Sequence, residues 1–262
     1  MIQVISWDDF LKKNPWENQK TSVTIGVFDG IHPGHQQLIK RLTSDEELTP
    51  IVFTFKVNPA MLTRPKTFKG NILTLEQKIE RVEKFGVKGA VIIDFSSDFS
   101  KLTGRNFFSH IGSKTKLSQV VLGENHRLGH KGETGADDAR IFLQKKGIKV
   151  FIEDSILQNE SPLSSTRVRN AIIEGHLNRV PELLGFEHIL DFRGLPHIFE
   201  AGIVKIERKR CHQVLPPDGI YEGIIFNHQE LFATKIILDK EQILWEQPID
   251  VPVERITIRN YE

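Results

Sequence analysis

Residues 22–42 read SVTIGVFDGIHPGHQQLIKRL, and this stretch decides the fold of the first half of the chain. Residues 22–28 are apolar and rich in β-branched side chains, which is typical of a strand covered on both faces. Asp29 and Gly30 follow as a strong turn signal that ends the strand. Three apolar side chains then recur at helical spacing on one face, which predicts a helix: Leu38, Ile39 and Leu42.

Two histidines stand where this helix is expected to begin. His35 lies on the apolar face, and His32 lies three residues earlier in the loop. Pro33 and Gly34 are expected to keep the backbone irregular before the helix. A helix N-terminus offers unpaired N–H groups and a partial positive charge, which suits phosphate. The stretch therefore predicts a phosphate-binding loop. The alternative is a plain strand, turn and helix with one buried and one exposed histidine.

Length and composition limit the class of protein. The 262 residues are enough for one α/β domain and a small second one. With a net charge of +1, nothing favours broad nucleic-acid binding. No apolar run is long enough to span a bilayer, and the N-terminus lacks a signal-peptide pattern. Cys211 is the single cysteine, so an intramolecular disulfide and a cysteine-rich zinc site are excluded, and we expect a cytoplasmic protein.

Strand-like and helix-like segments alternate up to about residue 186, without a hairpin signal. Residues 58–69, rich in Pro, Thr and Lys, are expected to be a mobile or functional loop. Because parallel strands need helical crossovers, the alternation predicts a three-layer α/β sandwich with a parallel sheet. In such sheets ligands bind beyond the carboxyl ends of the strands, which is where the glycine-rich loop lies. Expected strands lie at 22–28, 51–55, 90–95, 119–122 and 148–152, and helices at 74–85, 104–111, 136–146 and 165–174.

The character of the sequence changes after Gly185. Short β-like runs lie at 201–206, 221–226, 232–238 and 255–258, and a Pro-Pro-Asp-Gly turn separates two of them. This pattern predicts a small antiparallel β domain. We therefore expect a first domain at 1–186 and a second at 187–262.

A second group of polar residues stands at residues 163–169, LSSTRVR, where another helix is expected to begin. Hydroxyls donate to phosphate oxygens, and guanidinium groups bind phosphate bidentately. The alternative is a serine N-cap followed by two solvent-facing arginines. The hydroxyl and guanidinium side chains are Ser164, Ser165, Thr166, Arg167 and Arg169.

Residues 26–35, GVFDGIHPGH, resemble the G-x-F-D-G-x-H-x-G-H signature of the prokaryotic bifunctional riboflavin kinase/FMN adenylyltransferases, the FAD synthetase family. Residues 163–169 resemble the I-S-S-T-x-I-R motif that follows it in that family. The resemblance implies a Rossmann-like fold of the H-x-G-H nucleotidyltransferase type. It also implies ATP and FMN as substrates and FAD as product. We expect Mg²⁺ to arrive with ATP, because the sequence indicates no dedicated protein site for it.

The resemblance further implies roles for the motif residues. His32 and His35 would donate to the ATP phosphates, and Arg169 would be the motif arginine that completes the catalytic set. Arg167 is a second candidate for that arginine. The other nucleotide-binding residues implied are Gly26, Phe28, Asp29, Gly30, Gly34, Ser164, Ser165 and Thr166.

The flavin-binding segments depart from the family pattern. Residues 123–129 resemble its G-E-N-F-x-F-G loop, but His126 and Leu128 replace the aromatic residues. Residues 55–59, FKVNP, stand where the family has F-x-P-H-P. Pro59 matches the last proline of that motif, whereas Val57 and Asn58 replace its first proline and its histidine. Asparagine donates and accepts hydrogen bonds but carries no charge. The resemblance implies flavin contacts from Asn58, Pro59, Asn125 and Leu128.

Beyond residue 185 the resemblance weakens. Residues 215–221, LPPDGIY, resemble the L-P-x-x-G-x-Y of the kinase domain, but residues 187–262 lack its G-F-P-T-A-N segment, which holds metal and phosphate. We therefore predict an FMN adenylyltransferase without riboflavin kinase activity. Two alternatives stay open: nucleotidyl transfer to another small phosphate, and a non-catalytic flavin- or nucleotide-binding protein.

Overall fold

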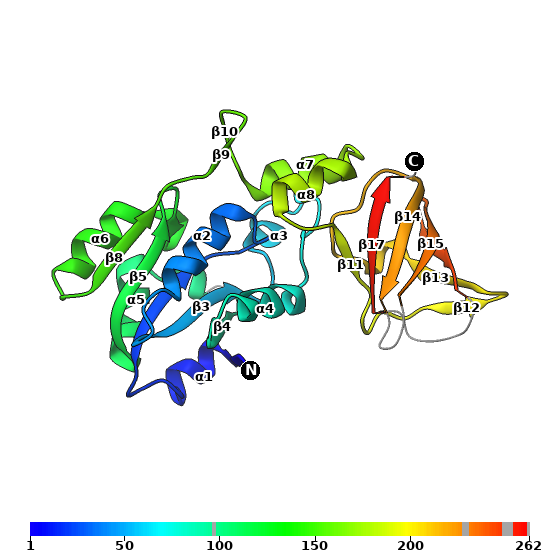
Figure 1. Cartoon of the computed structure of the whole chain (residues 1–262). Helices are drawn as coiled ribbons and strands as arrows, with labels where there is room; N and C mark the ends of the chain where they lie inside the picture. The colour runs from blue at the N-terminus through cyan, green and yellow to red at the C-terminus, as the bar shows by residue number, and fades with distance from the viewer. Residues whose placement is uncertain (96–97, 227–230, 248–253, 261–262) are drawn as a thin grey trace. The chain divides into compact units, whose positions relative to one another are not determined.

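A computed structural model describes residues 1–95, 98–226, 231–247 and 254–260 (Figure 1). The chain divides into two compact units that interleave along the sequence. The first unit contains residues 1–66 and 78–163, and the second contains residues 67–77 and 164–262. The expected domain boundary after residue 186 stays a prediction.

The first unit is built on a six-stranded parallel sheet in the order β1-β4-β3-β2-β5-β8. Every neighbouring pair runs parallel, which confirms the predicted α/β architecture. The first two strands are β1, Gln3–Ser6, and β2, Lys20–Ile25. The other four are β3, Thr49–Phe55; β4, Gly89–Ile93; β5, Lys116–Gly123; and β8, Lys149–Glu153.

Helices lie on both faces of this sheet (Figure 1). On one face a buried cluster packs Phe10, Phe107 and Phe142 of the helices against Phe53 of the sheet. The unit boundary falls within α4, between its third and fourth residues. The helices are α1, Trp7–Lys12; α2, Pro33–Leu42; α4, Leu75–Lys84; α5, Gly104–Lys114; and α6, Ala136–Gln144.

The second unit contains the predicted antiparallel sheet, in the order β11-β17-β14-β15-β16-β13-β12. Helices α7, Ser165–Ile173, and α8, Val180–Leu184, precede it. Three strands were not predicted: β11, Ile189–Asp191; β12, Ile198–Glu200; and β16, Gln242–Glu246. The others are β13, Ile203–Glu207; β14, Gly219–Phe226; β15, Leu231–Leu238; and β17, Arg255–Asn260.

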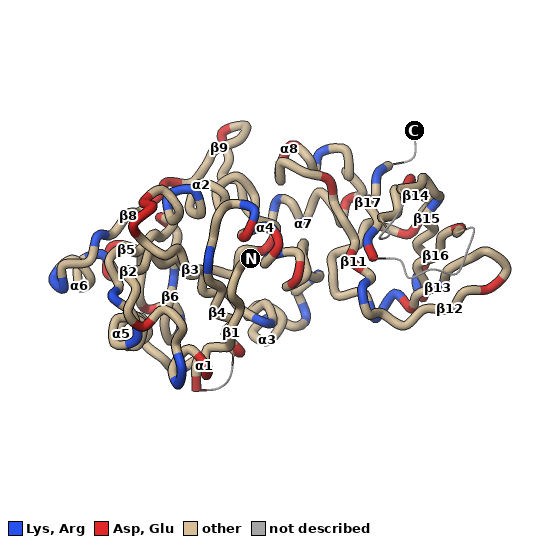
Figure 2. The backbone as a smooth tube through the Cα atoms, turned by 60° about the horizontal axis from the view of Figure 1, so that its bottom comes forward, with Lys and Arg blue, Asp and Glu red and all other residues tan. Residues whose placement is uncertain are grey.

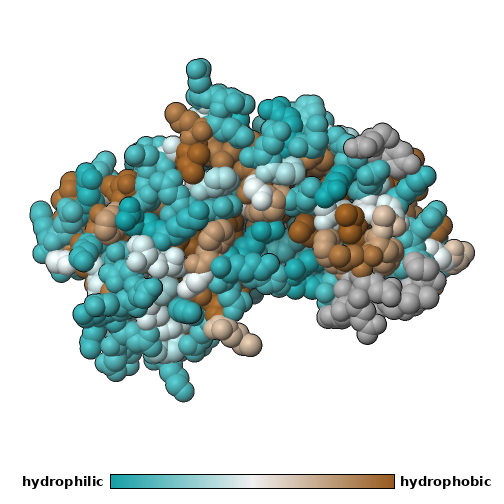
Figure 3. Space-filling view, in the orientation of Figure 1, coloured by the Kyte–Doolittle hydropathy of each residue, from teal (hydrophilic) through white to brown (hydrophobic). Residues whose placement is uncertain are grey.

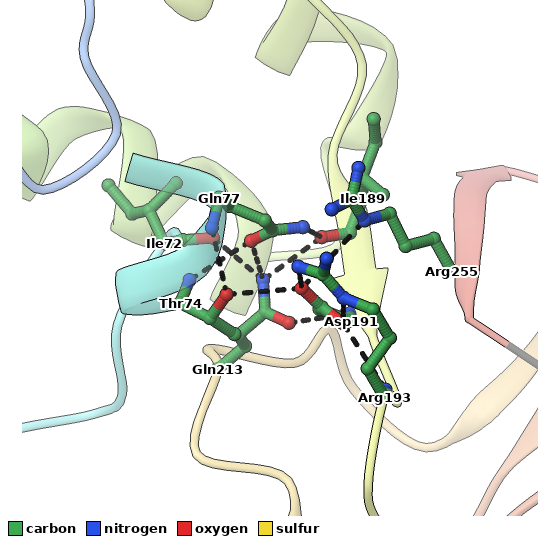
Figure 4. A network of polar contacts seen from close by, with 8 residues as sticks. All are labelled: Ile72, Thr74, Gln77, Ile189, Asp191, Arg193, Gln213 and Arg255. Carbon is green, nitrogen blue, oxygen red and sulfur yellow. Dashed lines mark hydrogen bonds and ion pairs between the residues drawn. The ribbon is translucent and has the colours of Figure 1, made fainter. Parts of the chain in front are cut away.

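A buried polar network holds residues 67–77 within the second unit (Figure 4). The side-chain oxygen of Gln213 accepts the main-chain N–H of Asp191 at 2.7 Å. Its amide nitrogen donates to three oxygens within 3.1 Å, which are the carbonyl oxygens of Ile72 and Ile189 and the side chain of Gln77. One side chain therefore connects a segment near residue 72 with β11.

The start of α4 carries a capping box. The N–H of Gln77 donates to the hydroxyl of Thr74 at 3.2 Å, and the N–H of Thr74 donates to the side chain of Gln77 at 3.0 Å. Two backbone donors at the helix start are satisfied in this way. The same hydroxyl donates to Asp191 at 3.1 Å, which adds the cap to the network of Figure 4.

Three expectations about local structure are wrong. Helix α2 begins at Pro33, because proline is favoured in the first turn of a helix, so Pro33 and Gly34 are helical and His32 is the N-cap. The segment 58–69 is not a loop throughout, because it contains a short helix, α3, Pro59–Thr63, which the side chain of Asn58 caps. That the segment is functional or mobile stays a prediction. Short hairpins also occur in the first unit, where none was expected: β6, Arg127–Leu128, with β7, Thr134–Gly135, and β9, Leu157–Gln158, with β10, Ser161–Pro162.

The surface carries mixed charge. Basic and acidic residues are interspersed along both units (Figure 2), and hydrophilic residues cover most of the face seen in Figure 3. No helix within the described residues is both long and apolar enough to cross a bilayer.

Candidate active site

The loop between β2 and α2 carries an unusual backbone. Phe28, Gly30 and Ile31 all have positive φ angles, of 51°, 91° and 43°. Left-handed backbone is costly for residues other than glycine, by roughly 1–3 kcal/mol, and it is found mostly at functional sites. The side chains of Phe28 and Ile31 are fully buried, so packing holds the loop in this conformation.

The loop brings the two predicted histidines into contact. The rings of His32 and His35 stack with centroids 3.9 Å apart, and the ring of Phe28 meets His35 edge-on at 5.3 Å. Two predicted glycines make room for these rings. A Cβ at Gly34 would lie 3.3 Å from the ring of His32, and one at Gly26 would lie 3.1 Å from the ring of Phe28.

Burial keeps both histidines uncharged at neutral pH. It lowers the pKa of His32 to about 4. The pKa of His35 lies well below its usual value, chiefly because of burial; repulsion between a second proton and His32, and repulsion by Lys78, lower it further. The Nδ1 atoms of both rings are buried and have no hydrogen-bond partner within the described residues. Buried polar atoms without partners are rare and call for an explanation, and a ligand at this loop supplies one.

Lys78 of α4 also belongs to this site, although it lies outside the predicted motifs. Its ammonium donates to the carbonyl oxygens of Val27 and Phe55, both at 3.2 Å, and to the hydroxyl of Thr54 at 3.4 Å. The side chain is buried. The sequence contains a signal for this placement, because Lys78 lies at helical spacing between the apolar residues Leu75 and Val82 and therefore on the same face of the helix.

The second predicted group lies in the second unit, at the start of α7. Ser164 is the N-cap, and its hydroxyl accepts the N–H of Arg167 at 3.3 Å. Arg169 does not project freely into solvent. Its Nε donates to the carbonyl oxygen of Gly70 at 2.9 Å, and its guanidinium lies 5.7 Å from the ring centroid of Phe68. Ser165 and Thr166 occupy the first two positions of the helix, and the side chain of Thr166 is exposed.

The predicted flavin residues lie beyond the carboxyl ends of two strands of the first unit, β3 and β5. After β3, the side-chain oxygen of Asn58 accepts the N–H of Ala60 at 3.0 Å, and Pro59 starts α3. After β5, the amide of Asn125 donates to the hydroxyl of Ser155, which follows β8, at 3.0 Å. The ends of β5 and β8 are therefore joined at this edge of the sheet.

The two residues that replace the aromatic residues of the family motif, His126 and Leu128, are both largely enclosed by the protein. Leu128 is buried in β6. Burial lowers the pKa of His126 to about 4, and its Nε2 is buried without a hydrogen-bond partner in the part of the chain that the structure describes. His126 is therefore a neutral ring. Among the described residues there is no cluster of three or more His, Cys, Asp or Glu side chains that could hold a metal ion.

Comparison with known proteins places this chain in a family. The FAD synthetase family model matches residues 14–167, more than half of the chain. This chain belongs to the FAD synthetase family. The matched range contains the loop between β2 and α2, the segments of Asn58 and Asn125, and the start of α7.

Relatives of two kinds match this chain. A bifunctional riboflavin kinase/FMN adenylyltransferase of Listeria monocytogenes is 30% identical over 217 residues, which are 79% of this chain and 68% of the relative. A protein named FAD synthetase from the same species is 25% identical over 226 residues, which are 79% of this chain and 92% of the relative. This chain therefore spans about two thirds of the bifunctional relative and nearly all of the FAD synthetase.

One solved structure is similar over the whole length. A crystal structure titled a macrolide-efflux protein from Streptococcus pneumoniae aligns with a TM-score of 0.82 at 20% identity, covering 100% of this chain and 92% of that one. At this identity the likeness supports the fold alone.

Proposed function

We propose that this chain is an FMN adenylyltransferase, which transfers AMP from ATP to FMN and releases pyrophosphate. The observation that carries the proposal is the stacked pair of neutral histidines, His32 and His35, at the start of α2. They lie beyond the carboxyl end of β2, where ligands of parallel sheets bind, in a chain that belongs to the FAD synthetase family.

The reaction is a direct transfer. A phosphate oxygen of FMN attacks the α-phosphorus of ATP in line and forms the new P–O bond. The bond from the α-phosphorus to the oxygen that bridges it to the β-phosphorus breaks, and pyrophosphate leaves with the electron pair. The enzyme contributes position and stabilisation of charge and forms no covalent intermediate. Mg²⁺ enters as the Mg²⁺ complex of ATP and offsets phosphate charge.

His32 and His35 serve this transfer as neutral donors. A neutral imidazole carries one N–H, which can donate to a phosphate oxygen without a charge that must first be desolvated. Gly26, Gly30 and Gly34 allow the nucleotide to approach the backbone, as residues without a Cβ do. Asp29, Phe28 and the left-handed turn hold the loop in shape, and the first two are buried.

The motif at the start of α7 is assigned to the β- and γ-phosphates and to the leaving pyrophosphate. Ser165 and Thr166 would donate hydroxyl hydrogens there, and Arg169 would donate from its guanidinium, with Arg167 as a further cation. Support comes from the residue types and from the fixed position of Arg169, which Gly70 and Phe68 hold. Ser164 acts first as the N-cap.

The flavin is assigned to the loops after β3 and β5, with contacts from Asn58, Pro59, Asn125 and Leu128. These residues lie at the carboxyl edge of the same sheet as the histidine pair, as binding of FMN next to ATP requires. His126 and Leu128 present less aromatic surface than the family motif, so we expect flavin affinity below that of relatives with two aromatics. The presence of only one cysteine supports placing the reaction in the reducing cytoplasm.

The test is incubation of the purified chain with ATP, Mg²⁺ and FMN, with FAD measured by chromatography and pyrophosphate by a coupled assay. We expect FAD and pyrophosphate in equal amounts. Parallel reactions with CTP and with other small phosphate monoesters test the altered flavin positions. If another phosphate monoester gave product and FMN did not, that monoester would take the place of FMN as the proposed substrate. Binding of ATP and FMN without any product would overturn the enzymatic assignment.

A further inference from the structure

A buried lysine lies at the edge of the sheet where the nucleotide is expected. The ammonium of Lys78 contacts the carbonyl oxygens of Val27 and Phe55 and the hydroxyl of Thr54. Val27 lies two residues beyond β2, and Phe55 is the last residue of β3. One ammonium therefore joins the carboxyl ends of two adjacent parallel strands.

These contacts argue against a direct role as a phosphate ligand. A lysine ammonium has three N–H donors, and three protein oxygens lie within 3.4 Å of Nζ. A bond from Lys78 to substrate would require it to give up one of them. Its contribution to the reaction must therefore act through the loop that it holds and through its charge.

The loop that Lys78 holds is the loop of the histidine pair. Val27 directly precedes Phe28, which has left-handed backbone and whose ring contacts His35. The charge of Lys78 also reaches His35, where it helps to lower the pKa of the imidazole. The titratable groups that act on His35 are thus Lys78 from α4 and His32 from the start of α2.

A purely structural purpose is a poor explanation for this residue. Lysine is seldom fully buried, and a buried charge is weak evidence for stability. An uncharged side chain could join two strand ends at a lower desolvation cost. A positive charge held under a phosphate-binding loop has an electrostatic use, because its attraction for the triphosphate is little screened by water.

We propose that Lys78 is a positioning residue for adenylyl transfer, whose ammonium fixes the turn that carries Phe28 and the histidine pair and whose charge attracts the ATP phosphates to that pair. The proposal rests on the proposed function for its effect on rate. It does not depend on that function for its effect on His35, which can be measured in the protein without substrate.

The experiment compares Lys78→Met, Lys78→Gln and the control Lys84→Met. Lys84 is exposed on the same helix, so the control removes the same charge away from the site. Glutamine keeps two N–H donors for the strand ends but lacks the charge. It therefore separates the contribution of the hydrogen bonds from that of the charge. The measurements are kcat and KM for ATP in FAD formation, the pKa of His35 by NMR titration without ligand, and thermal unfolding.

We expect both neutral variants at Lys78 to lower kcat/KM for ATP by roughly 10- to 100-fold, as small displacements in an active site do. In both, the pKa of His35 should rise, because one of the charges that lowers it is gone. Lys84→Met should stay within about twofold of the parent in rate, a change that corresponds to well under one kcal/mol in the barrier.

Three results would overturn the proposal. Parent-like activity of Lys78→Gln would show that the donors suffice and the charge does nothing. An unchanged titration of His35 in Lys78→Met would show that the charge does not act on the pair. Failure of both neutral variants to fold, with Lys84→Met folded, would make Lys78 a structural residue only. A parent that makes no FAD would instead overturn the proposed function, while the His35 titration would still decide the role of the charge.

Discussion

His32 and His35 stack at the start of α2 with 26° between their ring planes. Two imidazolium charges at this distance would repel each other, and burial already disfavours the charged form of each ring. The pair is therefore neutral at neutral pH and presents N–H donors in place of positive charge. Such donors are in position before the reaction begins, which is what stabilisation of a developing phosphate charge requires.

Removal of either ring tests this interpretation. We expect His32→Ala and His35→Ala each to lower kcat for FAD formation by roughly 10²–10³-fold, as loss of one preorganised donor does in comparable sites. His35→Ala should also lower the melting temperature, because it removes the ring that contacts both His32 and Phe28. His110→Ala, at an exposed position of α5, is the control and should leave the rate unchanged. Near-parental rates in both site variants would contradict the assignment.

Acid should destabilise the protein through its buried histidines. Burial lowers the pKa of His32, His126 and His188 to about 4 in the folded chain. A histidine in the unfolded chain has a pKa of about 6.5, so the unfolded chain binds more protons between these values. The stabilisation is therefore complete above about pH 6.5 and is lost as the pH falls toward about 4.

His126→Phe isolates one part of this effect, because phenylalanine does not titrate. We expect the free energy of unfolding in urea to fall less steeply for His126→Phe than for the parent between about pH 7 and about pH 4.5. His110→Phe, at an exposed position, should follow the parent curve. If the free energy of unfolding had the same pH dependence in the parent and in His126→Phe, His126 would be protonated in the folded protein as readily as in the unfolded chain.

The sheet of the first unit could be predicted from sequence because its signals are local. Residues 51–55 form one continuous apolar and β-branched run, and β3 extends over it. The loop after β2 could be predicted for the same reason, since its glycines and histidines lie within ten residues. The start of α2 differs from the expectation because Pro33 occupies the first helical position, where the missing N–H of proline costs nothing.

Contacts between distant residues could not be predicted in the same way. Gln213 bonds the carbonyl oxygen of Ile72 across 141 residues of sequence, and no local pattern at either residue indicates this bond. Strand β11 has three residues, too few to reveal a period of two. Lys78 was missed because a lone lysine on a helix is usually solvated, and only its spacing with apolar neighbours distinguished it.

Arg169→Lys should not behave as a conservative change. The guanidinium donates to Gly70 through Nε and lies over the ring of Phe68, which leaves its Nη groups oriented in a fixed plane. Lysine cannot reproduce this planar, forked geometry. We expect ATP affinity, measured by calorimetry, to fall by roughly tenfold or more, the scale of one lost charge-assisted hydrogen bond. Arg179→Lys, at an exposed position in the second unit, is the control, and equal affinities in both variants would remove Arg169 from the phosphate site.

Gln213→Ala should destabilise the second unit without touching the proposed chemistry. The change removes the acceptor of the Asp191 N–H and the donor to Ile72 and Ile189, all within the buried network of Figure 4. A buried polar group left without a partner costs about 1–3 kcal/mol. We expect a loss of at least that size in the free energy of unfolding by urea. Gln144→Ala, at the exposed end of α6, should change it by less than about 0.5 kcal/mol, and similar values for both variants would contradict the importance of the network.

Riboflavin should not be a substrate of this chain, although FMN should be. Residues 187–262 contain no G-F-P-T-A-N segment, so the threonine and asparagine that hold metal and phosphate in the kinase domain of the family are absent from its sequence. Phosphoryl transfer depends on simultaneous placement of metal, phosphate and base, and loss of the metal ligands should abolish it. The sheet nevertheless forms, since Gly219–Phe226 pairs with Leu231–Leu238 along its full length. A missing kinase activity would therefore not reflect a missing fold.

With ATP and Mg²⁺ we expect riboflavin to give no FMN by chromatography, while added FMN gives FAD in the same preparation. FMN formed from riboflavin by the purified protein would mean that other residues of the second unit supply the metal and phosphate ligands.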